Sequence, residues 1–306
     1  ALNGGVASAT RAATAGMPNV IDARIAQTRG AASGDAFKDG GVWLKPYFSN
    51  GEQDADGVIN GYDVESSGVV IGVDGEVAQN WRAGLAVGSA KSDVTDRLAD
   101  VNVSSTLVSL YGAYQMNERT SLDLTLGFAD NSYDSARIAG LSGVANASFS
   151  GDQLNLGAKL ARAYQSTETR TFTPSVAMQY TQVNVGGYSE TGGGIFAQTV
   201  QSVEEVSMSI MADAKWEWTM SNSGVFGANI GLGYDNADSV SATSTLANNG
   251  PTYSTNGIQP EELFLGAGLG YSYVTSKNLE LSAAYDLEAR DGFQNGVASV
   301  KVKMPF

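Results

Sequence analysis

The sequence lacks two residue types on which much enzyme chemistry depends. Its 306 residues contain no cysteine and no histidine. Without cysteine, no disulfide or thiolate nucleophile can form. Without histidine, the serine–histidine–aspartate triad and nearly all zinc sites are excluded. We therefore expect a protein that is not an enzyme, with no catalytic residue, no metal site and no cofactor.

Long hydrophobic runs are also absent. No stretch reaches the ~18 consecutive apolar residues of a transmembrane helix, yet 42% of the chain is hydrophobic and only 16% is charged. Such a chain can bury apolar surface in lipid if its apolar residues alternate along strands. The formal net charge of −14 disfavours a nucleic-acid partner.

From about Gly41 onward, apolar and polar residues alternate in segment after segment. After Thr120, for example, Leu122, Leu124 and Leu126 fall on one face and polar or small residues on the other. This period is typical of strands with two different faces. The twelve predicted strands lie at 42–50, 62–77, 81–93, 102–116, 120–134, 145–164, 169–185, 197–218, 224–240, 258–275, 279–290 and 296–306.

The length of these strands separates two all-β folds. Strands of a soluble sandwich are usually about 5–6 residues long, whereas crossing a bilayer takes about 9–11 tilted residues. Alternation here persists over a dozen positions in several segments. The sequence therefore predicts an all-β fold, a 12-stranded antiparallel transmembrane β-barrel, and a soluble sandwich is the alternative.

The connections between the predicted strands alternate in length. Those after even-numbered strands are short, such as Asn117-Glu118-Arg119, and most of the others are long and polar, such as Ser241 to Gly257. Outer-membrane barrels have short periplasmic turns and long external loops. We therefore expect an integral protein of the bacterial outer membrane, in contact with lipid and lipopolysaccharide, with both ends of the barrel in the periplasm.

Residues 1–40 do not alternate, so we divide the chain into a leader with a pore-plugging α-helix (1–40) and a barrel (41–306). Met17 to Arg29 predicts a helix that ends at Gly30, and helical structure could extend upstream through Ala7 to Ala15. A barrel of twelve strands is wide enough to hold a helix about 10–12 Å across. We expect the helix inside the pore, with an exposed periplasmic helix as the alternative. The plug residues are Ile21, Asp22, Arg24, Ile25 and Arg29.

A helix inside the pore requires a polar inner wall. Inward positions of the predicted strands carry charged residues that could pair with the arginines and the aspartate of the plug. Adjacent acids such as Glu261-Glu262 point to opposite faces of a strand, so they cannot act together on one bond. The lumen-facing candidates are Lys45, Asp74, Arg82, Asp123, Lys159, Glu217, Glu280, Glu288, Lys301 and Lys303.

Three segments carry a resemblance to a known family. The first is the series Gly41-Val42-Trp43-Leu44-Lys45-Pro46-Tyr47, Gly61-Tyr62, Gly68, Gly72-Val73-Asp74 and Trp81-Arg82-Ala83-Gly84. It resembles the start of the β-domain, or translocator domain, of type Va autotransporters. The stretch Arg24 to Arg29 resembles the helix that precedes that domain. The alternating residues Val300, Val302, Met304 and Phe306 resemble the C-terminal barrel assembly signal.

The resemblance implies a translocator domain that exports and anchors an N-terminal passenger through its barrel, or with its help. The implied partners are its own passenger domain, the barrel assembly machinery and periplasmic chaperones, and we expect a monomer. A passive outer-membrane channel or porin with a plug helix is the alternative, and an adhesin with binding loops is another. Because the first residues lack the apolar core of a signal peptide, we expect a mature product or a domain of a longer precursor.

Overall fold

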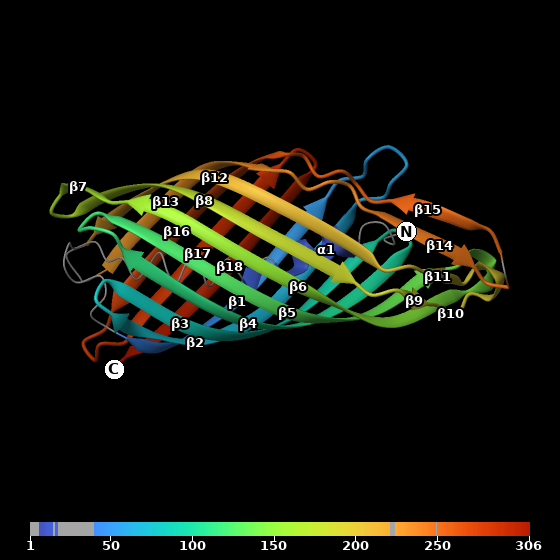
Figure 1. Cartoon of the computed structure of the whole chain (residues 1–306), viewed down its shortest axis with the longest axis horizontal. Coiled ribbons are helices and arrows are strands. Elements are labelled where there is room, and N and C mark those ends of the chain that lie inside the picture. Colours follow the sequence, from blue (N-terminus) through green and yellow to red (C-terminus); the bar gives the residue numbers. More distant parts are fainter. Residues whose placement is uncertain (1–5, 15, 18–39, 221–223, 249) are drawn as a thin grey trace.

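Twelve long strands form one closed antiparallel wall in the structure, a computed structural model that describes residues 6–14, 16–17, 40–220, 224–248 and 250–306 (Figure 1). Each strand pairs with its neighbours in sequence, and pairing of the first with the last closes the wall. The predicted 12-stranded antiparallel barrel is confirmed. Its strands are β1 (Gly41–Gln53), β2 (Tyr62–Ala78), β3 (Trp81–Asp96), β4 (Ala99–Gln115), β5 (Thr120–Ile138), β6 (Val144–Arg162), β8 (Arg170–Val185), β12 (Val203–Thr219), β13 (Gly224–Asp235), β16 (Leu263–Val274), β17 (Glu280–Arg290) and β18 (Phe293–Pro305).

The polarity of the wall is the reverse of that of a soluble protein, with apolar side chains outside and polar side chains inside. On β5, Leu126 and Phe128 are 46% and 53% exposed on the outside, whereas Asp123 and Asn131 are buried on the inside. The same alternation runs along β1 to β4. An outer surface this apolar needs lipid around it, as in transmembrane barrels. No helix among the described residues is long and apolar enough to cross a membrane.

The two rims of the barrel differ as the connection lengths predict. At one rim the turns are tight, and Asn80 and Asn278 occupy them with φ of 65° and 61°. Asparagine adopts this left-handed conformation more readily than most residues. Aromatic pairs flank this short-turn rim, with Trp81 and Tyr114 stacked at 4.7 Å between ring centroids. The opposite rim carries the long connections, and we call it the long-loop rim.

The long-loop rim is more ordered than the sequence predicts. Four short strands, β9 (Tyr188–Ser189), β11 (Gln198–Val200), β14 (Ser241–Leu246) and β15 (Thr252–Asn256), form a separate sheet there. Tyr188 also stacks on Phe149 of β6 at 4.1 Å, and burial raises the pKa of its phenol above the ordinary value. The small elements β7 (Tyr164–Thr167), β10 (Thr191–Gly192), η2 (Gly140–Ser142) and η3 (Gly194–Phe196) complete the fold.

Two predictions about this rim were wrong. The segment 197–218 is not one strand, because its start, β11, pairs with β9 and β14, and β12 begins only at Val203. The amide of Gln201 donates to the carbonyl of Thr243 at 2.9 Å and so turns the chain toward the small sheet. The segment Ser241 to Gly257, predicted as a loop, contains the hairpin β14–β15.

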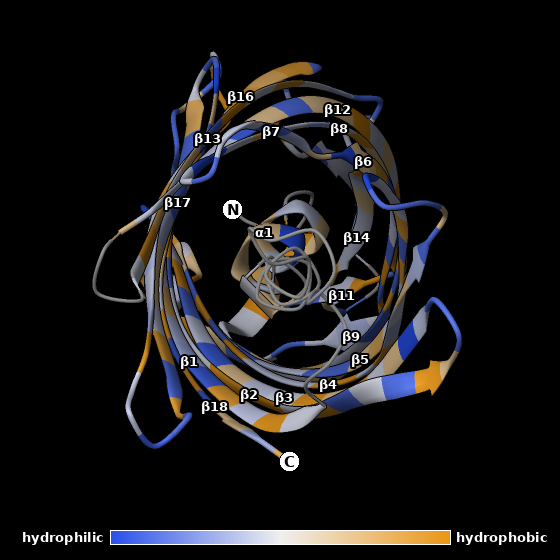
Figure 2. Ribbon diagram, turned by 90° about the vertical axis from the view of Figure 1, so that its left-hand side faces the viewer, coloured by the Kyte–Doolittle hydropathy of each residue, from blue (hydrophilic) through white to orange (hydrophobic). Residues whose placement is uncertain are grey.

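A helix lies inside the barrel. Helix α1 (Val6–Thr14) sits near the centre when the molecule is viewed along the barrel (Figure 2). The prediction of an N-terminal α-helix inside the pore is confirmed, and α1 falls within the alanine-rich stretch upstream of the predicted helix. The predicted helix beyond Met17, with Ile21, Asp22, Arg24, Ile25 and Arg29, lies outside the described residues.

Candidate functional site

The first face of α1 is apolar and packs against the long-loop half of the barrel. Val6, Ala9 and Ala13 are buried against inward side chains such as Tyr62 and Val94. Small side chains let the helix lie close to the wall. The buried hydroxyl of Thr10 donates to the carbonyl of Val6 at 2.7 Å, which satisfies its hydrogen-bonding group within the helix.

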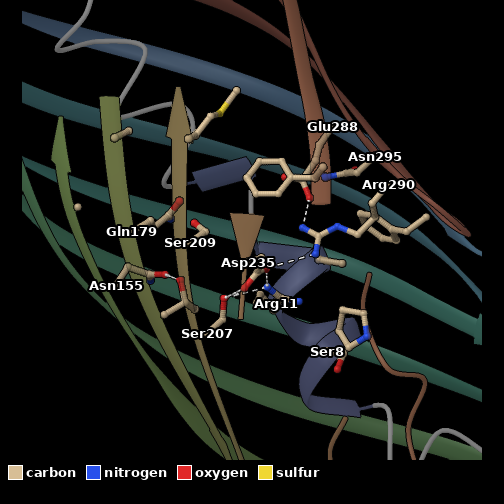
Figure 3. A pocket seen from close by; sticks show the side chains of 18 of the residues that line it. Ser8, Arg11, Asn155, Gln179, Ser207, Ser209, Asp235, Glu288, Arg290 and Asn295 are labelled. Carbon is tan, nitrogen blue, oxygen red and sulfur yellow. Dashed lines mark hydrogen bonds and ion pairs between the residues drawn. The ribbon is translucent and has the colours of Figure 1, made fainter. Parts of the chain in front are cut away.

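The second face of α1 carries Ser8 and Arg11, three residues apart and so on one side of the helix. The guanidinium of Arg11 lies 2.7 Å from Asp235 Oδ2 (Figure 3). It also lies 3.0 Å from Glu205 Oε1. Ser8 Oγ donates to Glu205 Oε2 at 2.6 Å. The carboxylate side chains of Glu205 and Asp235 are 1% and 2% exposed, so this face is held by buried ion pairs.

Asp235 is the centre of this charged cluster. It accepts a hydrogen bond from Ser207 Oγ at 2.6 Å and forms an ion pair with Arg290 Nη1 at 3.2 Å. Arg290 in turn pairs with Glu288 at 2.5 Å (Figure 3). Because a buried charge is strongly destabilising without its partner, the cluster ties α1 to β12, β13 and β17.

A second set of contacts holds the C-terminal end of α1. Thr14 Oγ1 donates to Gln153 Oε1 at 2.7 Å. The carbonyl of Ala13 accepts hydrogen bonds from Ser66 Oγ at 3.0 Å and Ser92 Oγ at 3.3 Å. The last carbonyls of a helix lack intrahelical partners, and here serine hydroxyls of β2 and β3 act as the donors instead. Met17, which is 1% exposed, continues the packing against inward residues of the barrel.

The helix does not fill the lumen. A cavity of about 290 Å³ lies beside its polar face, toward β5, β6, β8, β12 and β17 (Figure 3). Gln153, Asn155, Gln179 and Lys159 line it together with the charged cluster. The inner wall is therefore polar on this side and can hold water next to the helix.

The ten lumen-facing candidates differ in how far the structure buries them. Lys45, Asp74, Arg82, Asp123, Lys301 and Lys303 are buried, and Lys159, Glu217, Glu280 and Glu288 are partly buried. The structure joins several of them to a charged neighbour: Lys301 to Glu280 at 2.5 Å, Glu217 to Lys215 at 2.8 Å, and Glu288 to Arg290. No group of three or more acidic, cysteine or histidine side chains that could hold a metal ion occurs within the described ranges.

The side chains that hold α1 were not among the predicted lumen residues. Glu205, Asp235 and Arg290 sit at inward strand positions near the long-loop rim, where strand periodicity could have identified them as lumen residues. Arg11 gives no such signal, because its nine-residue helix is rich in alanine, and its partner Asp235 is 224 residues away. The arginines that the sequence assigned to this role, Arg24 and Arg29, lie outside the described residues.

A second buried charge pair lies on the inner wall near the short-turn rim. Arg82 donates to Asp74 Oδ1 from Nε at 2.9 Å and from Nη2 at 2.7 Å. Tyr111 donates its hydroxyl to Asp74 Oδ2 at 2.8 Å, and Trp43 Nε1 donates to the Tyr111 hydroxyl at 2.7 Å. This network joins β1, β2, β3 and β4 through one carboxylate.

We expect Asp74→Ala to lower the free energy of unfolding by about 3–5 kcal/mol, because it removes the buried carboxylate that accepts hydrogen bonds from Arg82 and Tyr111. Urea unfolding of the barrel in lipid vesicles measures this change. Asp93→Ala, on the outer face of β3, should cost little. If both substitutions lowered the free energy of unfolding equally, the buried Asp74–Arg82 pair would stabilise the barrel no more than an exposed acid does.

A family model matches most of this chain. The family model described as "Autotransporter beta-domain" matches residues 42–286. Outer membrane protein A of Rickettsia rickettsii is 28% identical over 176 residues, which cover 53% of this chain and 8% of that protein. Outer membrane protein B of Rickettsia prowazekii is 27% identical over 209 residues, which cover 61% of this chain and 12% of that protein. The matched region thus spans about a tenth of the length of these relatives.

Solved structures share the fold. The translocator domain of the autotransporter NalP from Neisseria meningitidis superposes with a TM-score of 0.77 at 18% identity, covering 96% of this chain and 97% of that one. The beta domain of the Bordetella autotransporter BrkA gives a TM-score of 0.64 at 16% identity, covering 87% and 99%. At these identities the likeness is one of fold.

Proposed function

Because this chain belongs to the autotransporter β-domain family, we propose that it exports and anchors a passenger polypeptide joined upstream of residue 1. The chain is an integral outer-membrane barrel, as its family and its apolar outer wall agree. The observation that carries the proposal is helix α1, held inside the lumen by the pairing of Arg11 with Glu205 and Asp235.

The direction of the chain supports this proposal. Val6 packs among residues near the long-loop rim, Met17 packs deeper in the barrel, and Gly40 lies at the short-turn rim, where its carbonyl accepts from the amide of Phe306. A polypeptide joined upstream of α1 would therefore leave at the long-loop rim. We infer that this rim faces the outside of the cell and that both barrel termini face the periplasm.

The wall and the lumen have complementary tasks in this proposal. Closed strand pairing satisfies the backbone groups of the wall against lipid. The polar inner wall gives an extended passenger segment a path along which its own backbone can stay hydrated. After export, α1 occupies this path and limits leakage. The sequence contains no G-x-x-x-x-G-K-[ST] motif for ATP binding, so the driving force must come from outside this domain.

Surface display of a reporter tests the proposal. A small, stably folded epitope domain is fused upstream of residue 1, behind a cleavable secretion signal, and expressed in a Gram-negative host. We expect an antibody to label intact cells and external protease to release the epitope. The matched control lacks β18 and should show no labelling, because its wall cannot close.

A second readout separates export from folding. Heat-modifiable migration in a denaturing gel reports whether the barrel has folded in the membrane. If the barrel is folded and the epitope stays in the periplasm, the proposed export function is wrong, and a passive channel becomes the better description.

A further inference from the structure

Strands β8, β12 and β13 are neighbours in the wall (Figure 1). A groove crosses the lipid-facing side of the wall over these strands. Its volume is about 710 Å³. Two alanines of β12, Ala212 and Ala214, form its floor. Each alanine is paired across the sheet with a larger residue on both sides, so Ala214 lies between Pro174 and Ile230.

The walls of the groove are apolar and exposed. Val176, Leu232 and Leu265 are 49%, 56% and 54% exposed on the outside of the barrel, and Leu160 extends the same row on β6. The lining side chains run across the strands from Leu160 of β6 to Leu265 of β16, and the small alanines of β12 leave the groove between them. In a bilayer this apolar groove faces acyl chains, and one of them can occupy it.

One end of the groove carries a positive charge. Arg162 of β6 lines the groove close to the short-turn rim, and its guanidinium carbon lies 5.4 Å from the ring centre of Tyr164. None of the ion pairs found within the described ranges involves Arg162. Arginines near the ends of membrane spans extend toward the headgroup level, and a guanidinium binds phosphate through charge-assisted hydrogen bonds.

Aromatic residues lie close to the Arg162 end of the groove and indicate its depth in the bilayer. Phe172 and Trp216, neighbours across β8 and β12, lie 5.3 Å apart between ring centroids. They are one outward position closer to the short-turn rim than Ala214. Tryptophan is enriched where acyl chains meet headgroups. Arg162 follows Ala161, which pairs with Ser175, so its backbone lies level with the alanine floor. Its guanidinium lies over Tyr164, which pairs with Phe172, so the charge reaches the level of the aromatic pair, where the phosphate of a phospholipid would lie.

We propose that this groove is a binding site for one anionic phospholipid, with an acyl chain over Ala212 and Ala214 and the phosphate at Arg162. The choice of a phospholipid over lipopolysaccharide rests on the proposed orientation, in which the short-turn rim faces the periplasmic leaflet. A lipid held across β6, β8, β12 and β13 would stabilise these strands against one another.

Lipid retention tests the site in the full chain. The protein is placed in nanodiscs of equimolar phosphatidylglycerol and phosphatidylethanolamine, extracted into mild detergent, and analysed by native mass spectrometry. We expect one phosphatidylglycerol to remain bound per barrel. Arg162→Gln should lower its retention about fivefold, the effect of one cation near an anionic headgroup. Ala214→Leu should abolish retention by filling the groove while keeping the surface apolar.

Matched controls separate the site from general effects on the barrel. Ala283→Leu makes the same change at an outward position of β17, and Arg97→Gln removes an exposed arginine at the long-loop rim; both should retain the lipid. Heat-modifiable migration confirms that each variant is folded. Equal retention by Ala214→Leu and Ala283→Leu, or equal retention of the two phospholipids by the unmodified chain, would overturn the proposal. Both leaflets of a nanodisc have the same lipids, so the retention measurement does not depend on which rim of the barrel faces the periplasm. Its failure would therefore leave the export proposal, which surface display tests, unchanged.

Discussion

Replacing Arg11 with glutamate is expected to unseat α1 and to raise the single-channel conductance of the barrel several-fold. The new carboxylate would face Glu205 and Asp235, both almost fully buried, in place of the guanidinium that now pairs with them. Breaking a buried pair in this way costs about 3–5 kcal/mol. That cost shifts the ratio of seated to unseated helix by roughly a hundredfold to several thousandfold. Planar-bilayer recording of the purified chain measures the outcome.

A charge swap sharpens this test. The double variant Arg11→Glu with Glu205→Arg restores an attractive pair at the same place, so it should recover part of the low conductance, and the recovered part measures the coupling between the two side chains. Arg97→Glu changes the same charge in an exposed turn and should leave the conductance unchanged. If Arg11→Glu conducts like the unmodified chain, α1 is not the element that limits flow.

The barrel itself could be predicted from the sequence because its signal is local and repeated. A slip of one residue would turn Leu122, Leu124 and Leu126 from lipid to lumen, so the alternation determines which face each side chain takes. The same pattern placed residues such as Lys45, Asp74 and Lys301 at inward positions. Strand order needed no further information, because each long strand pairs with the next one along the chain.

The seating of α1 could not be predicted, because its partners are set by the closed wall. Ser8 and Glu205 are 197 residues apart, and Arg11 and Asp235 are 224 apart. Nothing in the chain near Arg11 identifies these carboxylates. The apolar face of α1 consists largely of alanine, whose small side chain gives a weak amphipathic pattern.

The small outer sheet and the lipid-facing groove were missed for a related reason. Strands as short as β9 and β11 show too few alternations to be distinguished from a polar loop. The groove arises from cross-strand neighbours, such as Ala214 between Pro174 and Ile230, and depends on the register of three strands rather than on any one segment. Periodicity identifies the face of a residue but not its neighbour on the next strand.

Substitutions at the C-terminus can distinguish an effect on barrel assembly from an effect on barrel stability. Met304 and Phe306 point outward and are 67% and 77% exposed, so each makes few contacts within the chain. Replacing both with serine removes apolar surface from lipid contact, at most about 1.5–3 kcal/mol for each side chain. If the barrel assembly machinery reads these positions, the double variant should nearly disappear from the outer membrane while its refolded barrel remains stable.

A matched pair of substitutions isolates recognition from the loss of lipid contact. Leu263 and Leu269 on β16 are 62% and 57% exposed on the same outer surface, so serine at both positions removes a similar apolar area far from the C-terminus. We expect this control to lower stability comparably and to reach the outer membrane at near-normal levels. Immunoblots of membrane fractions and urea unfolding in lipid vesicles give the two readouts. Equal loss of both variants from the membrane would mean that the terminal residues act through stability alone, because position would then make no difference to assembly.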